Sequence, residues 1–158
     1  MKRAAALAMI IALLLTMITG CGKPRSARAL LLEFEIAYGI DHTVYSPDVP
    51  EGEAGYVSDE FFEIMYMYGE SCVTDYAVAQ GSDLSSISEC AIFICDGEHN
   101  AERMRLYLIE RLELLSSSAK LSGIDYPEGA FVKRYGSTVV MSVLADNARA
   151  ERIFNKIL

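Results

Sequence analysis

Three cysteines in the middle of the chain, Cys72, Cys90 and Cys95, are its most reactive internal side chains. In an oxidising compartment two of them can form a disulfide bond, which leaves one thiol over. Cys90 and Cys95 are separated by an odd number of positions, so on one strand they point to opposite faces and cannot pair. A bond would therefore join Cys72 to Cys90 or to Cys95. We favour the alternative that all three are small buried hydrophobic residues.

Motifs for metal binding or hydrolysis do not stand out. A structural zinc site needs about four ligands at close spacing, and neither His42 nor His99 lies in such a pattern. The Gly-x-Ser-x-Gly turn of serine hydrolases is missing from the sequence. A glycosidase needs two carboxylates at a set separation, for which there are too many candidate pairs. We expect no bound metal, no cofactor and no enzymatic activity, with a hydrolase as the alternative.

Glu89 and Arg111 are candidates for an ion pair. A strand from Glu89 to Asp96 would run about 23 Å at 3.3 Å per residue. A helix returning from Glu98 to Arg111 would cover about 20 Å at 1.5 Å per residue, so Glu89 and Arg111 become level. Arg111 falls at the border of the helix's apolar stripe, where a partly buried pair can form. In a functional interpretation the pair is a clamp that binds an anion or a peptide, because arginine binds carboxylates with two donors. In the remaining interpretation Glu89 and Arg111 are two unrelated surface charges.

A second candidate site is the loop from Asp48 to Tyr56, which also carries Glu51 and Glu53. Its three carboxylates on a glycine-rich backbone are ligands that a weak calcium site can use. The loop does not match the twelve-residue calcium loop of helix-loop-helix proteins. A solvated acidic loop is the simpler expectation.

The first residues have the pattern of an export signal. Lys2 and Arg3 are followed by an uncharged apolar run from Ala4 to Thr19, which is shorter than the roughly 20 residues of a membrane-spanning helix. The run ends at Ile18-Thr19-Gly20-Cys21, which resembles the lipobox of bacterial lipoproteins. That resemblance implies cleavage before Cys21 and attachment of lipid to its thiol. A retained anchor and an ordinary cleaved signal are the alternatives.

This interpretation divides the chain into three parts. Residues 1–20 form the signal peptide, residues 21–28 the lipidated Cys21 and a short linker, and residues 29–158 a single domain of sufficient size for a real core. The resemblance to lipoproteins places the protein on the extracytoplasmic face of the cell membrane. Its expected contact with the membrane is the N-terminal lipid.

The charge of the chain is negative and uneven. The formal net charge is −8, and between Ala29 and Glu102 there are 16 acidic residues and no Lys or Arg. From Arg103 onward there are nine basic and six acidic residues. Nucleic-acid binding needs a basic footprint, so we expect no nucleic-acid partner. The same balance argues against docking on anionic lipid through a polybasic segment.

Hydrophobic periodicity and turn residues predict an α+β domain with an antiparallel sheet of about four to five strands and helices packed on one face. Ser58 is a predicted helix N-cap and Gly69 a helix end. Adjacent strand pairs favour antiparallel pairing. The expected helices are Ala27–Tyr38, Ser58–Gly69, Asn100–Ala119 and a last one after Asp146, and the expected strands are His42–Ser46, Val73–Gln80, Ile87–Cys95, Ala130–Arg134 and Thr138–Leu144.

From Asp75 onward the order of features is similar to a family of small lipoproteins of unknown function, common in clostridia and their relatives. The matching segments are Asp75-Tyr76-Ala77-Val78, Glu89-Cys90-Ala91-Ile92-Phe93, Arg111-Leu112, and Tyr135-Gly136 through Leu144. Where that family often has a basic residue after the Phe-containing strand, this chain has Ile94-Cys95-Asp96. The resemblance implies a fold and no activity. We therefore expect a non-enzymatic binding or accessory domain with an envelope protein as partner, and the alternative is a lipid-anchored hydrolase.

Overall fold

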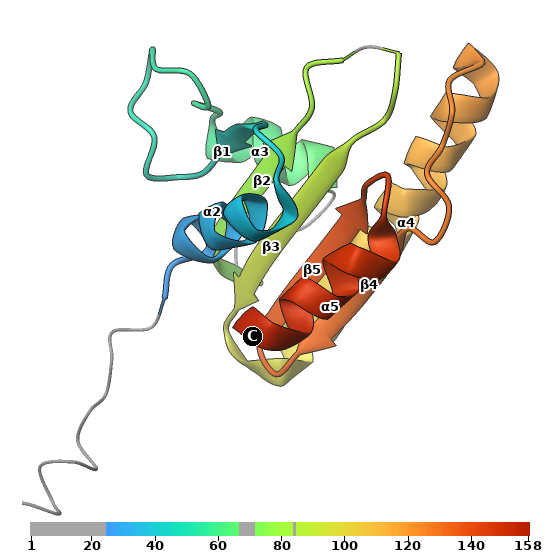
Figure 1. Ribbon diagram of the computed structural model, residues 1–158. Helices are drawn as coiled ribbons and strands as arrows, with labels where there is room; N and C mark the ends of the chain where they lie inside the picture. The colour runs from blue at the N-terminus through green and yellow to red at the C-terminus, as the bar shows by residue number, and fades with distance from the viewer. Residues whose placement is uncertain (1–24, 67–71, 84) are drawn as a thin grey trace, which may run out of the picture.

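The structure is a computed structural model that describes residues 25–66, 72–83 and 85–158. A single five-stranded sheet lies between helices (Figure 1). The elements in chain order are α2 (Ala27–Tyr38), β1 (Thr43–Tyr45), α3 (Asp59–Tyr66), β2 (Val73–Gln80), β3 (Glu89–Cys95), α4 (Gly97–Ser122), β4 (Phe131–Tyr135), β5 (Thr138–Val143) and α5 (Asn147–Ile157).

The sheet has the strand order β1-β2-β3-β5-β4, and every neighbouring pair is antiparallel. β3 lies at its centre, with Glu89 opposite Gln80 of β2 on one side and Val143 of β5 on the other. Six of its seven residues are buried, as expected for a strand covered on both faces. The predicted α+β class and antiparallel sheet are confirmed.

Helices cover both faces of the sheet, so the prediction that they lie on one face is wrong. Successive side chains of β2 and β3 alternate between two cores. One core gathers Val78, Ala91 and Phe93 beneath α3 and α4, and the other gathers Ala79 and Ile92 beneath α2 and α5. Figure 1 shows α2 and α5 in front of the sheet and α4 behind it. Because β2 and β3 carry apolar side chains on both faces, the second face also has to be covered, and α2 and α5 cover it.

Local signals set the ends of the helices. The Ser26 hydroxyl accepts a hydrogen bond from the Ala29 N–H at the start of α2, and Gly39 ends that helix in the left-handed conformation. Ser58 caps α3 in the same way through the Phe61 N–H, as predicted. Asp146 likewise accepts from the Arg149 N–H at the start of α5.

α4 is longer than the central strand of the sheet. Its 26 residues extend about 39 Å, whereas the seven residues of β3 extend about 23 Å. The C-terminal turns of α4 therefore project past the sheet, away from the end of the domain at which α2 begins (Figure 1). Leu114 and Leu121 on this projecting part are 53% and 89% exposed.

Several predicted features lie outside the described residues, namely the signal peptide, Cys21 and the predicted helix end at Gly69. Within the described ranges, no helix combines the length and the apolar character that crossing a bilayer requires.

Candidate functional site

The ion pair predicted between Glu89 and Arg111 forms, and it is part of a larger buried network. Arg111 on α4 donates from Nη2 to Glu89 Oε2 over 2.9 Å, and from Nε to Oε1 over 3.4 Å. The Tyr66 hydroxyl on α3 donates to Glu89 Oε1 over 2.8 Å. The Gln80 amide at the end of β2 donates to Oε2 over 3.1 Å. The Glu89 side chain is only 5% exposed.

This network holds four elements together and is not an open binding clamp. Each carboxylate oxygen of Glu89 accepts two hydrogen bonds, and the face of the Arg111 guanidinium lies 5.2 Å from the centre of the Tyr66 ring. Burial, and then the adjacent Glu89 carboxylate, raises the pKa of the Tyr66 hydroxyl well above its ordinary value, which keeps it a donor. The charges that an external anion would bind already satisfy each other.

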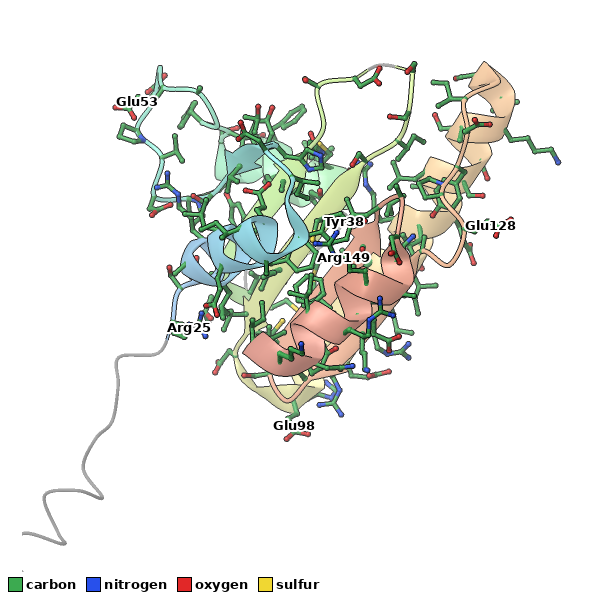
Figure 2. The ribbon with its side chains drawn as sticks, viewed as in Figure 1. Arg25, Tyr38, Glu53, Glu98, Glu128 and Arg149 are labelled. Atoms are coloured by element: carbon green, nitrogen blue, oxygen red, sulfur yellow. The ribbon has the colours of Figure 1, made fainter. Side chains whose placement is uncertain are left out.

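The acidic loop does not form the cation site that its sequence suggested. Asp48 accepts from the Ser46 hydroxyl, which lowers the pKa of the carboxyl, and it pairs with Arg28 on α2 over 3.3 Å. Glu51 and Glu53 are exposed, and Glu53 lies on the outer part of the loop (Figure 2). Among residues 25–66, 72–83 and 85–158 no group of three possible ligands gathers. An arginine therefore takes the carboxylate that would have anchored a cation.

The three internal cysteines are buried, and none of them forms a disulfide bond in the structure. Cys90 lies in the core beneath α2 and α5, whereas Cys72 and Cys95 lie in the core beneath α3 and α4. The Cys72 and Cys95 thiols are hydrogen-bonded neighbours; burial, and then the Cys72 thiol, raises the pKa of Cys95 to about 12. The structure thus identifies Cys95 as the thiol closer to Cys72, and the prediction of small buried residues is confirmed.

Sequence reasoning missed a contact between a serine and a histidine at the end of the β2–β3 hairpin. Ser88 Oγ lies 3.2 Å from His42 Nε2, although the two residues are 46 positions apart. Burial lowers the pKa of the His42 imidazole, so at neutral pH it is the uncharged base. His42 Nδ1 is buried without a hydrogen-bond partner among the described residues. The backbone N–H of His42 donates to Glu35 Oε1 over 3.3 Å. Nothing in the sequence around Ser88 or around His42 indicates that the two side chains are neighbours.

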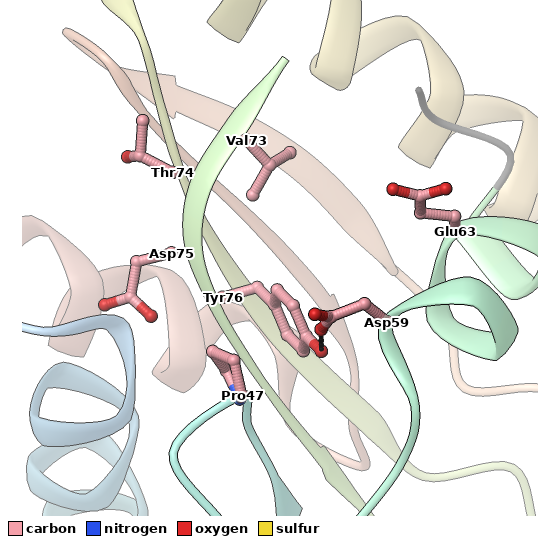
Figure 3. Close-up of a pocket in the computed structure, with 7 residues that line it drawn as sticks. All are labelled: Pro47, Asp59, Glu63, Val73, Thr74, Asp75 and Tyr76. Carbon is pink, nitrogen blue, oxygen red and sulfur yellow. Dashed lines mark hydrogen bonds between the residues drawn. The ribbon is translucent and has the colours of Figure 1, made fainter. Parts of the chain in front are cut away.

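A cavity of about 250 Å³ opens between α3 and β2 (Figure 3). Two of its three carboxylates are used within the fold: Asp59 accepts from the Tyr76 hydroxyl over 2.8 Å, and Asp75 accepts from the Ala27 N–H over 2.7 Å. These two bonds fasten α3 and the start of α2 to the same strand. The remaining lining residues are Pro47, Glu63, Val73 and Thr74.

A larger groove of about 650 Å³ lies between the C-terminal half of α4 and the segment that leads into β4. Its size is that of an ordinary ligand or peptide groove. The Tyr126 hydroxyl donates to the Leu112 carbonyl across it, over 3.4 Å. Its other lining residues are mainly polar or acidic: Glu113, Ser116, Ser117, Pro127, Glu128, Gly129 and Ala130. This combination suits a neutral or basic polypeptide segment better than an anion.

Comparison of the chain with protein-family models, with curated proteins and with solved structures finds no match. Similarity therefore assigns neither a family nor an activity. What the protein does has to be inferred from its own residues and their arrangement.

Proposed function

We propose that the chain is an exported lipoprotein, held on the extracytoplasmic face of the cell membrane by lipid on Cys21. In this proposal residues 29–158 form a non-enzymatic binding or accessory domain at the cell envelope. The observation that carries the proposal is the position of Ser26, the N-cap of α2, five residues after Cys21. A folded domain that starts so soon after an apolar leader and a cysteine has the arrangement of a domain tethered close to a membrane.

The orientation of the domain supports binding at its far end. α2 follows the proposed tether in the sequence and starts at one end of the domain, and the projecting turns of α4 lie at the other end (Figure 1). There Leu121 is 89% exposed, and the groove lined by Ser116, Ser117 and Tyr126 opens nearby. A tether at one end and an exposed apolar residue beside a groove at the other favour recognition of a protein that approaches from outside the membrane.

The tether is tested by labelling cells with a fatty acid analogue. The wild-type protein should take up the label, and Cys21→Ser should lose it while Cys72→Ser, which removes a buried thiol, retains it. Label on Cys21→Ser would contradict the proposal, as would a native protein that begins at a residue other than an acylated Cys21.

The binding end is tested by photo-crosslinking on intact cells. A photoreactive residue at Leu121 should give a discrete crosslinked partner, whereas the same residue at the exposed Glu51 should not. Substituting Ser117→Arg in the groove should reduce the crosslink at Leu121 without changing acylation. An equal yield at both positions would contradict recognition at this end of the domain.

The alternative, a lipid-anchored hydrolase, is favoured by one observation, the 3.2 Å contact between Ser88 Oγ and His42 Nε2. A serine nucleophile needs such a base, and the base needs a third group that orients it. His42 Nδ1 has no such partner in the described part of the chain, so the binding function comes first. The test is hydrolysis of small activated esters by the wild-type protein. Activity that disappears in Ser88→Ala and persists in Ser86→Ala would favour the hydrolase over the binding domain.

A further inference from the structure

α5 carries three basic side chains on the surface that it turns away from the sheet. It buries Ala150 and Phe154, and at 100° per residue Arg149, Arg152 and Lys156 fall within about 60° of one another on the opposite side. All three are exposed. The one carboxylate of the helix, Glu151, points elsewhere and binds Lys133 of β4 over 2.9 Å.

α2 exposes apolar residues next to this basic strip. It buries Leu31, Phe34 and Tyr38 against the sheet, which leaves Ile36 83% and Leu32 41% exposed on the outside. The exposed carboxylate of this helix, Glu33, is paired with Arg25. The exposed part of α2 is thus apolar around Leu32 and Ile36, and the charge of Glu33 is balanced by Arg25.

The two strips form one continuous surface because α2 and α5 pack side by side on the same face of the sheet (Figure 1). Arg149 on α5 donates to the Ala37 carbonyl of α2 over 3.1 Å, and its guanidinium covers the Tyr38 ring (Figure 2). A groove of about 430 Å³ along the contact is lined by Ala37, Arg149, Arg152, Ile153, Lys156 and Ile157. We call this surface, with Leu32 and Ile36, the α2–α5 outer face.

The α2–α5 outer face is cationic although the protein is acidic. The face carries Arg149, Arg152 and Lys156, in a chain whose formal net charge is −8. The nearby carboxylates of Glu33 and Glu151 are paired with Arg25 and Lys133. Acidic residues without basic neighbours in sequence are concentrated elsewhere, in the loop from Asp48 to Glu53 and along α3. A molecule whose basic residues gather on one side turns that side toward a negatively charged surface.

We propose that the α2–α5 outer face lies on the anionic lipid headgroups of the membrane to which the chain is tethered. This inference rests on the proposed lipidation of Cys21. Ala27 follows Cys21 by only six positions, a reach of about 20 Å when fully extended. Arg152 and Lys156 then bind phosphates, while Ile36 enters the boundary between headgroups and acyl chains. A second copy of the chain fits this face poorly, because a symmetric contact would bring like charges together.

The sequence itself offers a clean probe, because it contains no tryptophan. The full chain carrying Ile36→Trp is reconstituted into phosphatidylglycerol vesicles, and its emission and its quenching by brominated lipid are compared with those of Leu121→Trp. Both positions are more than four-fifths exposed in the structure, at 83% and 89%. The Ile36→Trp emission should shift to the blue and be quenched severalfold more than that of Leu121→Trp.

Binding to anionic lipid is distinguished from other contacts of the α2–α5 outer face by removing the charges of the protein or of the lipid. Adding Arg152→Gln and Lys156→Gln to the Ile36→Trp chain should weaken its quenching, since each basic residue near the surface is worth roughly a fivefold change in partitioning. Lys120→Gln on α4 should leave it unchanged. In phosphatidylcholine vesicles the quenching should also fall.

Emission of Ile36→Trp that stays water-like in anionic vesicles would overturn the inference. So would a blue shift that is already present without vesicles, because a second copy or another protein would then cover the face. The mass of the purified native protein reports acylation separately. An acylated chain with a water-exposed Ile36→Trp refutes only the docking face, whereas a chain without lipid refutes the proposed function.

Discussion

The two faces of the central sheet are closed by different interactions. Beneath α3 and α4 the core is aromatic, with Phe62 stacked on Tyr76 at 4.1 Å, and it contains the charged Glu89–Arg111 network. Beneath α2 and α5 the core is largely aliphatic around Phe34, which is stacked on Phe154 at 4.2 Å and on Tyr38 at 5.5 Å. Buried polar groups on this side include the Glu35 carboxyl and the neutral Asn147 amide. The Asn147 amide makes four hydrogen bonds, to Ser142, Leu144 and Glu128.

The difference separates two roles of charge in one small domain. On the α3–α4 side a fully hydrogen-bonded ion pair fixes four elements in a single arrangement. On the α2–α5 side the basic residues lie outside: Arg149 contacts α2, and Arg152 and Lys156 are exposed. Exposed basic side chains can bind a negatively charged partner.

The first prediction compares the two aromatic anchors and has the largest expected effect. Phe93→Ala and Phe154→Ala should each lower the free energy of unfolding by about 4 kcal/mol, because each leaves a cavity in a fully buried core. Chemical denaturation of the two variants measures this. Phe61→Ala, at a position that is 56% exposed, is the control. A small loss from Phe154→Ala would mean that the α2–α5 layer is dispensable.

The second prediction concerns the charged network. Glu89→Gln should cost about 3 kcal/mol, because it leaves the Arg111 guanidinium without a counter-charge in a largely buried site. A double-mutant cycle with Arg111→Met should show strong coupling, since the double variant removes both charges at once. Glu102→Gln in the exposed pair with Arg105 should change stability by less than about 1 kcal/mol. Additive single effects would show that Glu89 and Arg111 do not stabilise each other.

The third prediction tests the neutral network on the opposite side. Asn147→Ala should cost about 2 kcal/mol, because the Leu144 N–H and the Glu128 carbonyl lose the partner that joins α5 to the preceding segments. Thermal unfolding is the measurement, with the exposed Asn155→Ala for comparison. A loss equal to that of Glu89→Gln would erase the energetic distinction between the two networks.

The smallest expected effect is a pH dependence from His42. Its pKa is below the ordinary 6.5 because of burial, so the unfolded chain takes up a proton at a pH where the folded chain does not. Stability should therefore fall between about pH 7.5 and pH 5.5, and less so in His42→Gln. Glu35, whose pKa is raised by burial, acts in the opposite sense at lower pH and is common to both proteins. Equal slopes would contradict a buried neutral imidazole.

Local patterns were sufficient to predict most elements. The strand Val73–Gln80 was predicted to the residue, because β-branched and aromatic residues fill it and polar residues follow it. Glu89 and Arg111 could be paired because a strand and the helix after it return by known rises per residue. The contact of Ser88 with His42 could not be predicted, since it depends on β1 pairing with β2 across a long separation in sequence.

Sequence alone established the helices, the strands and the antiparallel sheet, because periodicity and caps act over a few residues, and it predicts the apolar leader that ends at Cys21. The negative net charge of the sequence argued against docking on anionic lipid through a polybasic segment. Tertiary structure decided that helices cover both faces, that Asp48 binds Arg28 instead of a cation, and that three bases share one surface with Ile36. Net charge sums over the chain, whereas a membrane or a partner meets one face at a time, and only packing determines which residues that face contains.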